Sequence, residues 1–242
     1  MADIRPTPAP APLSPADLPD LYRRYAADLA AARTAQRDLL APGSPRLRPK
    51  LDDIEAELTY LMVRHYRPWV VAEIGTFHGW STTWLLRALR DNGTGALHSY
   101  DIVDHARRTV PAALADGRWT FHHGDVRQAG LTPGLIDYLF VDAAHTAPFA
   151  RWYTTGLFTQ LRPGTPVSVH DVYHRRRPGP VSEGRVVLDW LAARRLGHFT
   201  ASRAAAPALY GELMAVRREL GLLAPVHRGD RNPMMFFRLG DS

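Results

Sequence analysis

The 242-residue sequence contains no cysteine. Disulfide bonds, thiolate zinc sites and cysteine nucleophiles are therefore excluded, and nothing in the redox chemistry points outside the cell. No apolar run is long enough to span a membrane, and the chain starts with proline and alanine rather than with the charged and apolar segments of a signal peptide. We expect a cytoplasmic protein without a membrane partner.

Most of the chain has no long run of residues with the same charge. The net charge is +6 and the pI is near 10, but the excess is mostly arginine, spread along the sequence with acids interleaved. Such a pattern favours a solvated surface over a nucleic-acid interface. The one concentrated basic patch is 174–177. No aromatic–basic RNA motif or helix-turn-helix pattern accompanies it, so no nucleic-acid partner is expected.

The length fits one α/β domain with additions, which would bury roughly 70–75% of its unfolded surface. Residues 1–13 are rich in proline and alanine and are expected to form a disordered tail. Apolar residues at helical spacing predict helices over 14–40 and 51–65, so that 14–66 forms a helical extension that caps the sheet, covers the ligand or contacts a second subunit. Residues 67–242 are then the ligand-binding domain.

From Val70 onward, strand and helix patterns alternate. The predicted strands are 70–74, 96–102, 119–122, 136–141, 166–169 and 234–239, and the predicted helices are 81–90, 104–115, 148–161, 181–194 and 204–220. This rhythm predicts a doubly wound, mostly parallel sheet with helices on both faces. Ligands of such sheets bind at the carboxyl ends of the strands.

The stretch 70–86 is the centre of this arrangement. Its apolar strand ends in Glu73 and Gly75, and the helical pattern resumes after Gly79. Glycine at these two positions permits a tight bend and a close approach of helix and ligand to the sheet, which is typical of a nucleotide-like site. A dinucleotide fingerprint would require glycine where this chain has Phe77 and Trp80, so NAD is a weak candidate.

Polar residues follow the other predicted strands as well. They are Asp101 after the second strand, Asp125 after the third, Asp142 and His145 after the fourth, and His170 and Asp171 after the fifth. An acid in the place of Asp101 accepts hydrogen bonds from ribose hydroxyls. Asp142, His170 and Asp171 follow strands that are neighbours in this topology, so we expect them to share one divalent ion.

The segment Glu73-Ile74-Gly75-Thr76-Phe77-His78-Gly79 resembles the first motif of class I S-adenosylmethionine-dependent methyltransferases, with Phe77 in place of the common middle glycine. Together with Val141-Asp142-x-x-His145 and His170-Asp171, it resembles the metal-dependent O-methyltransferases over about 70–172. These are the catechol methyltransferase group and, more closely, antibiotic-tailoring enzymes such as macrolide-sugar methyltransferases and the cephalosporin-hydroxylase-like proteins. The resemblance implies a seven-stranded sheet closed by an antiparallel hairpin that contains the last strand.

The resemblance also implies roles for individual residues. Those implied to bind S-adenosylmethionine are Glu73, Gly75, Thr76, Gly79, Ser81, Asp101, Asp125 and Asp142. Those implied to bind Mg²⁺ or Mn²⁺ are Asp142, His170 and Asp171, and His145 is implied to be the general base. His170 stands where the family usually has a carboxylate; imidazole suits hard Mg²⁺ poorly, which favours Mn²⁺, another transition ion or no metal.

The expected function is O-methylation of a hydroxyl group on a small molecule, a secondary metabolite, by a homo-oligomer. The main alternative is a methyltransferase fold recruited to a non-methylating reaction, such as a cyclisation, in which S-adenosylmethionine stays intact. A nucleic-acid-binding module, or an RNA methyltransferase as a minor variant, stays open because the fold does not fix the substrate.

Overall fold

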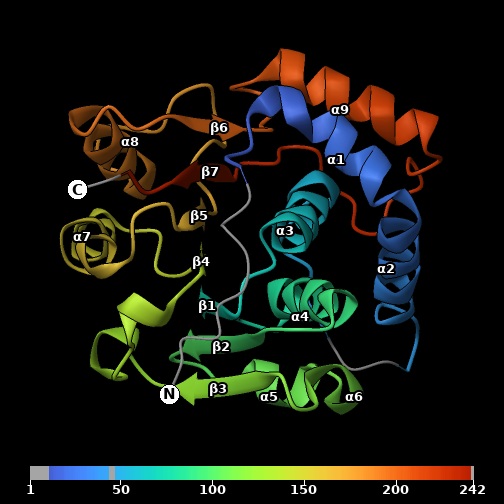
Figure 1. The fold of residues 1–242 in the computed structure, drawn as a ribbon, viewed down its shortest axis with the longest axis horizontal. Helices are drawn as coiled ribbons and strands as arrows, with labels where there is room; N and C mark the ends of the chain where they lie inside the picture. Colours follow the sequence, from blue (N-terminus) through green and yellow to red (C-terminus); the bar gives the residue numbers. More distant parts are fainter. Residues whose placement is uncertain (1–10, 44–46, 241–242) are drawn as a thin grey trace.

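The computed structural model describes residues 11–43 and 47–240. A seven-stranded sheet in the order β3-β2-β1-β4-β5-β7-β6 runs through the molecule (Figure 1). All neighbouring strands are parallel except β7, which is antiparallel to both β5 and β6. The strands are β1 (Val70–Ile74), β2 (Ala96–Asp101), β3 (Trp119–His123), β4 (Tyr138–Val141), β5 (Pro166–Val169), β6 (His198–Thr200) and β7 (Met235–Arg238). The predicted doubly wound, mostly parallel fold is confirmed.

The central strands are buried on both faces, as a parallel sheet requires. Successive residues alternate between two hydrophobic clusters: Val71 and Phe140 belong to one, whereas Ala72 and Leu139 belong to the other. The chain winds in opposite directions from β1 and β4, which are neighbours. Such a switch in strand order opens a crevice at the carboxyl ends of the strands.

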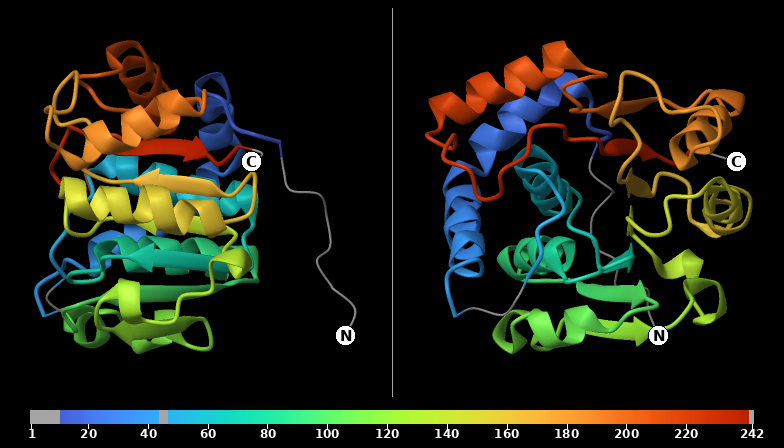
Figure 2. Two further views of the ribbon diagram at one scale, coloured as in Figure 1. Left: turned by 90° about the vertical axis from the view of Figure 1, so that its left-hand side faces the viewer. Right: turned by 180° about the vertical axis from the view of Figure 1, so that it is seen from behind.

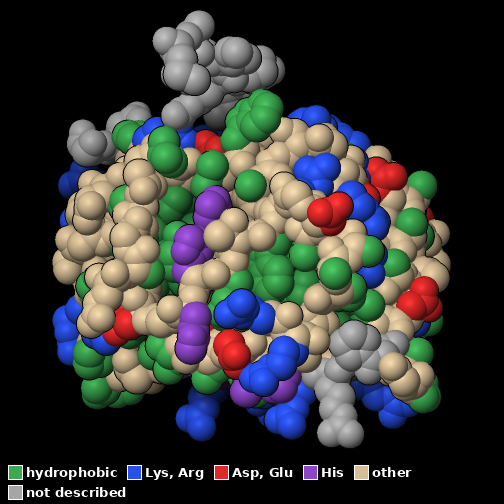
Figure 3. Space-filling model, turned by 90° about the horizontal axis from the view of Figure 1, so that it is seen from below, with side chains coloured by type: hydrophobic (Ala, Val, Ile, Leu, Met, Phe, Trp, Pro, Cys, Tyr) green, Lys and Arg blue, Asp and Glu red, His purple; other side chains and the backbone are tan. Residues whose placement is uncertain are grey.

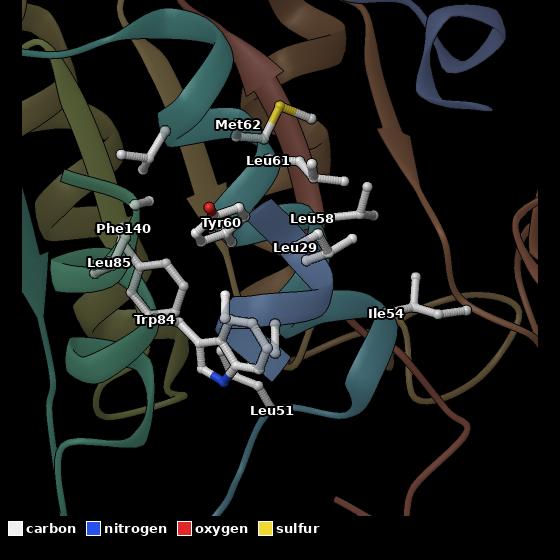
Figure 4. Close-up of a cluster of buried hydrophobic side chains, with 14 of the residues drawn as sticks. Leu29, Leu51, Ile54, Leu58, Tyr60, Leu61, Met62, Trp84, Leu85 and Phe140 are labelled. Carbon is white, nitrogen blue, oxygen red and sulfur yellow. The ribbon is translucent and has the colours of Figure 1, made fainter. Parts of the chain in front are cut away.

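The first cluster lies under helices from three separate parts of the chain. They are α1 (Leu18–Arg24), α2 (Ala26–Asp38), α3 (Asp53–Tyr66), α4 (Trp80–Asn92) and α9 (Pro207–Glu219). Figure 4 shows Leu29 of α2, Leu58 of α3, Trp84 of α4 and Phe140 of β4 in this cluster. The helices of 14–66 therefore share one core with the sheet, while the predicted domain boundary at residue 66 stays a prediction. Of the expected tail at 1–13, residues 1–10 lie outside the described residues, whereas the backbone N–H of Leu13 donates a hydrogen bond to the hydroxyl of Tyr66 (3.3 Å).

The opposite face of the sheet is covered by α7 (Ala147–Trp152) and α8 (Glu183–Ala193), as the two further views make clear (Figure 2). A π-helical segment, Tyr153–Leu157, and a 3₁₀ turn, Phe158–Gln160, continue α7 toward β5. The predicted helix over 148–161 is thus correct in extent, but only its first part is α-helical. A π-helix is rare and often marks a functional position.

Two other predicted helices are interrupted. The helix expected over 14–40 consists of a 3₁₀ turn (Pro15–Asp17), α1 and α2, and it breaks at Tyr25, whose backbone leaves the helical region. The helix expected over 104–115 divides into α5 (His105–Thr109) and α6 (Ala112–Ala115). Pro111 causes this break because proline lacks an N–H donor and favours an extended residue before it.

Short elements complete the described residues. Two 3₁₀ turns, Val126–Gln128 and Pro133–Leu135, lie between β3 and β4. The strand β6 was not predicted, and β6 and β7 pair without forming the implied hairpin because α9 intervenes. The edge strand β3 is only partly buried, and the view from that edge shows histidines beside hydrophobic surface (Figure 3). Within the described residues, no helix has the length and apolarity needed to cross a membrane.

A buried charge network ties the N-terminal helices to α9. The carboxylate of Glu57 on α3 pairs with the guanidinium groups of Arg33 and Arg217, and it accepts a hydrogen bond from the hydroxyl of Tyr22 (2.9 Å). Asp53 lies 3.4 Å from Arg33 and 3.2 Å from Arg217. Removing one partner of such a network leaves an uncompensated buried charge, so the network strongly constrains how these helices pack.

Candidate active site

A cavity of about 680 Å³ lies at the carboxyl ends of β1, β2, β4 and β5. Its lining includes Gly75, Asp101, Asp125, Asp142 and His170. This volume is within the range of small-molecule and cofactor sites. The strand ends that the sequence singled out therefore surround one cavity.

The loop after β1 depends on glycine at two places. Gly75 has a φ of +88°, and a Cβ there would lie 1.8 Å from the carbonyl oxygen of Asp142, so no side chain fits. Gly79 has a φ of +79° and precedes α4, where a Cβ would lie 2.5 Å from a methyl group of Val110. The backbones at the ends of β1 and β4 consequently touch, and this close approach shapes the floor of the cavity.

Asp101 fastens this loop. Its Oδ2 accepts hydrogen bonds from the backbone N–H of Thr76 (2.7 Å), the hydroxyl of Thr76 (3.1 Å) and the N–H of Phe77 (2.8 Å). Its Oδ1 accepts from the N–H of Val103 (3.0 Å). Asp101 also lines the cavity, so one residue both holds the loop and borders the cavity.

Glu73 lies behind the loop. Its side chain is fully buried, and its carboxylate accepts hydrogen bonds from the hydroxyls of Ser81 (2.5 Å), Thr82 (2.8 Å) and Ser99 (2.6 Å). Burial raises the pKa of Glu73 to about 7, although the three hydrogen bonds act in the opposite direction. The carboxylate thereby joins β1, β2 and α4.

The eight predicted cofactor residues divide into two groups. Gly75, Asp101, Asp125 and Asp142 line the cavity. The other four do not line the cavity but form or support the loop after β1: Glu73, Thr76, Gly79 and Ser81. Asp125 forms an ion pair with Arg127 (2.5 Å), whose hydrogen bonds lower the pKa of Asp125.

At the other end of the cavity, Asp142, His145, His170 and Asp171 meet. Oδ1 of Asp142 lies 3.0 Å from Nδ1 of His170 and 3.3 Å from Nε2 of His145. The Asp171 carboxylate lies 3.2 Å from Nδ1 of His170 and 3.5 Å from Nε2 of His145. The sequence prediction that these four residues converge is correct in geometry.

Two buried glutamates contact the outer nitrogens of the two imidazoles. Oε2 of Glu183, the first residue of α8, lies 3.1 Å from Nδ1 of His145. Oε2 of Glu55, in the first turn of α3, lies 3.4 Å from Nε2 of His170. Sequence reasoning missed both, because an acid in the first turn of a helix ordinarily stabilises the helix dipole.

The excess of carboxylates governs the charge of the histidines. Burial alone would lower the pKa of His145, but hydrogen bonds to Asp142 and Glu183 and the charge of Asp171 raise it to about 10. The pKa of His170 is likewise raised, against its burial, by Asp142 and Glu55. The same contacts hold the pKa of Asp142 well below its usual range, although its burial acts in the opposite direction. A cluster with this much negative charge favours a bound cation.

Three of the six non-glycine residues that have a positive φ in the described part of the chain line this cavity. Phe77, His145 and Asp171 line it with φ values of +45°, +47° and +57°, in the left-handed region that non-glycine residues seldom adopt. Strained residues of this kind persist where the surrounding structure fixes them, which is common at functional sites.

The donor atoms fit a divalent ion. One ligand atom from each of Asp142, His145 and His170 lies within 4.8 Å of the other two, and the Asp171 carboxylate lies beside both imidazoles. The predicted set of Asp142, His170 and Asp171 therefore lies together, with the imidazole of His145 next to it. Mixed imidazole and carboxylate donors suit Mn²⁺ or another transition ion, and a carboxylate on the far nitrogen of each imidazole is the usual second contact of a metal-binding histidine.

Comparison with known proteins agrees with the fold. Residues 72–172 match the family described as "Methyltransferase domain". No curated protein matches the sequence. Among solved structures, TomG from Streptomyces achromogenes, an O-methyltransferase involved in tomaymycin synthesis and solved with S-adenosylmethionine, is 19% identical, with a TM-score of 0.53 over 89% of this chain and 90% of that one.

A second similar structure is the O-methyltransferase from Bacillus cereus in complex with S-adenosylhomocysteine. It is 16% identical, with a TM-score of 0.54 over 88% of this chain and 90% of that one. At these identities the likeness establishes the shared fold. The family match adds that residues 72–172, from β1 to just beyond β5, are similar to a methyltransferase domain.

Proposed function

We propose that the protein transfers a methyl group from S-adenosylmethionine to a hydroxyl group of a small molecule. The observation that carries this proposal is the position of His145, whose Nε2 faces Asp142 and Asp171 in the cavity bounded by Gly75. A proton acceptor beside a nucleotide-binding loop is what O-methylation requires. A secondary-metabolite acceptor is supported by the role of TomG in tomaymycin synthesis.

S-adenosylmethionine supplies an electrophilic methyl group. In the transfer, the sulfur–methyl bond breaks as the oxygen–methyl bond forms, which leaves S-adenosylhomocysteine and a methyl ether. The hydroxyl proton passes to Nε2 of His145, which faces the cavity. Asp101 and Asp125 would bind the ribose and the adenine of the cofactor, a role supported by their presence in the lining of the cavity. Fixing donor and acceptor in one cavity supplies much of the rate enhancement.

Asp142, His170 and Asp171 would hold the divalent ion. When bound there, it would polarise the acceptor hydroxyl and offset the carboxylate charge that raises the pKa of His145. Without such an ion, a pKa of about 10 keeps His145 protonated at neutral pH, a state in which it accepts no proton. The proposal therefore couples the base to the cation site.

The first test is calorimetric binding of S-adenosylmethionine with and without Mn²⁺, followed by mass-spectrometric detection of S-adenosylhomocysteine with a panel of phenols and sugar hydroxyls. We expect His145→Ala to lower turnover by at least about 100-fold with nearly unchanged cofactor affinity. The matched control is His65→Ala, in the last turn of α3, which should leave turnover unchanged.

Three outcomes would contradict the proposal in separate ways. Unchanged turnover of His145→Ala would rule out His145 as the general base. Full activity after exhaustive chelation would rule out a role for a divalent ion. An altered acceptor together with intact S-adenosylmethionine would instead favour a non-methylating reaction such as a cyclisation. The homo-oligomeric state stays a prediction that gel filtration can test.

A further inference from the structure

Glu183 is placed in an unusual way for a residue in the first turn of a helix. Its side chain is 5% exposed, and both carboxylate oxygens are engaged. Oε1 accepts a hydrogen bond from the hydroxyl of Tyr153 (2.8 Å), while Oε2 lies 3.1 Å from Nδ1 of His145. The carboxylate is thus the middle of a three-residue chain that runs from the core to the cavity.

The start of α8 does not need Glu183 as a cap. The hydroxyl of Ser182 already accepts a hydrogen bond from the N–H of Arg185 (3.2 Å). Glu183 instead extends to residues of a different element, and its burial has a desolvation cost that two hydrogen-bonding partners offset. A purely helix-stabilising role would leave the carboxylate in solvent near the helix end.

Three backbone features bring the chain of contacts together. An isolated antiparallel bridge joins Thr146 to Ser182, so the residues next to His145 and Glu183 are paired directly. His145 adopts a left-handed conformation with a φ of +47°. Tyr153 is the first residue of the π-helical segment, a rare element that often occurs at functional positions.

We propose that Glu183, itself held by Tyr153, is the positioning residue of His145. It accepts the proton on Nδ1, which fixes the ring plane and leaves Nε2 directed at Asp142 (3.3 Å) and Asp171 (3.5 Å) in the cavity. A carboxylate behind an imidazole determines which nitrogen carries the proton and how the ring is oriented. The inference rests on the proposed function only in naming His145 as the base.

The test that needs neither acceptor nor cofactor is proton NMR of the full chain with ¹⁵N-labelled histidine. We expect a downfield, slowly exchanging Nδ1–H resonance that disappears in His145→Gln. It should move upfield in Glu183→Gln, whose amide oxygen still accepts the proton, and vanish in Glu183→Leu, which has no acceptor. Ser182→Ala weakens the same helix start without touching the imidazole and should leave the resonance in place.

Tyr153→Phe provides a milder variant in case Glu183→Leu does not fold. It keeps the ring and removes the donor to Oε1, so the Nδ1–H resonance should persist with faster exchange. In the assay for S-adenosylhomocysteine, we expect turnover to fall about 10-fold in Glu183→Gln and about 100-fold in Glu183→Leu. The KM for S-adenosylmethionine should stay within about twofold of the wild-type value.

Two results would overturn the inference: no resonance that depends on His145, or one that persists unchanged in Glu183→Leu. A fall in turnover that Ser182→Ala reproduces would reduce Glu183 to a structural role. If the resonance series behaves as expected but no acceptor yields S-adenosylhomocysteine, the positioning contact stands and the proposed methyl transfer fails.

Discussion

Replacing Glu73 by glutamine tests whether the acid of the glycine loop supports the fold or touches the cofactor. In the folded protein the pKa of Glu73 is raised from 4.5 to about 7, chiefly by burial. The folded state therefore binds this proton more tightly than the unfolded state does. The stability that follows is fully present below about pH 4.5 and is lost as the pH rises through 7.

The magnitude follows from the same two values. At 1.36 kcal/mol per pH unit, ionisation of the buried carboxyl costs about 3 kcal/mol of folding free energy once the pH exceeds 7. Between pH 5 and pH 8 the loss is about 2–3 kcal/mol. Glutamine has nearly the same shape and does not titrate, so the stability of Glu73→Gln relative to wild type should rise by this amount over that interval.

The assay is urea unfolding of both proteins at pH 5, 6, 7 and 8, with the difference in unfolding free energy plotted against pH. Other titrating groups are shared and cancel in the difference. A flat difference, or one that falls with pH, would refute the reasoning. S-adenosylmethionine affinity should change by less than about threefold, because Glu73 does not line the cavity; a loss of about 100-fold (~2.7 kcal/mol) would show direct contact.

Three further perturbations test other parts of the structure. Glu57→Ala should destabilise the fold by about 3–5 kcal/mol in urea unfolding, because it leaves two buried guanidinium groups, those of Arg33 and Arg217, with the single carboxylate of Asp53. Gly75→Ala should abolish S-adenosylmethionine binding in calorimetry and cost more than about 1 kcal/mol of stability, because the new Cβ meets the end of β4. Mn²⁺ affinity should rise as the pH increases above neutral, because the ion must displace the proton of His170, whose pKa is raised by Asp142 and Glu55 against its burial.

Matched controls separate these effects from general damage. Glu219→Ala removes a surface partner of Arg23 and should leave the urea midpoint nearly unchanged, because an exposed ion pair contributes little to stability. Gly117→Ala also replaces a glycine of positive φ (+65°), but no atom lies within 4 Å of its Cβ position, so cofactor binding should be unaffected. Mn²⁺ affinity independent of pH would argue against imidazole ligands.

Local patterns were sufficient for much of the fold. The limits of β1 and β5 were predicted correctly, because short apolar runs bounded by turn residues are distinctive. The interruption at Pro111 was missed although its cause is visible in the sequence. β6 was missed because three residues, 198–200, carry too little pattern, and their pairing with β7 depends on residues far away in the chain.

In the candidate site, too, some residues could be predicted from local patterns and others could not. Asp142, His145, His170 and Asp171 were identified because each follows a strand end, and strand ends meet at one edge of a parallel sheet. Glu55 and Glu183 could not be found in this way, because their contacts arise from how α3 and α8 pack. The motif singled out Glu73 as a cofactor residue, which stays a prediction, and its burial behind the loop became visible only in three dimensions.

The two glutamates behind the imidazoles lie outside residues 72–172, one on each side of that segment. A chimaera that contains only this segment would include the glycine loop, Asp142 and both histidines. It would lack the two carboxylates that contact the outer nitrogens of the imidazole rings. Substitutions in α3 or at the start of α8 can therefore change the contacts of the two imidazoles without altering any residue of 72–172.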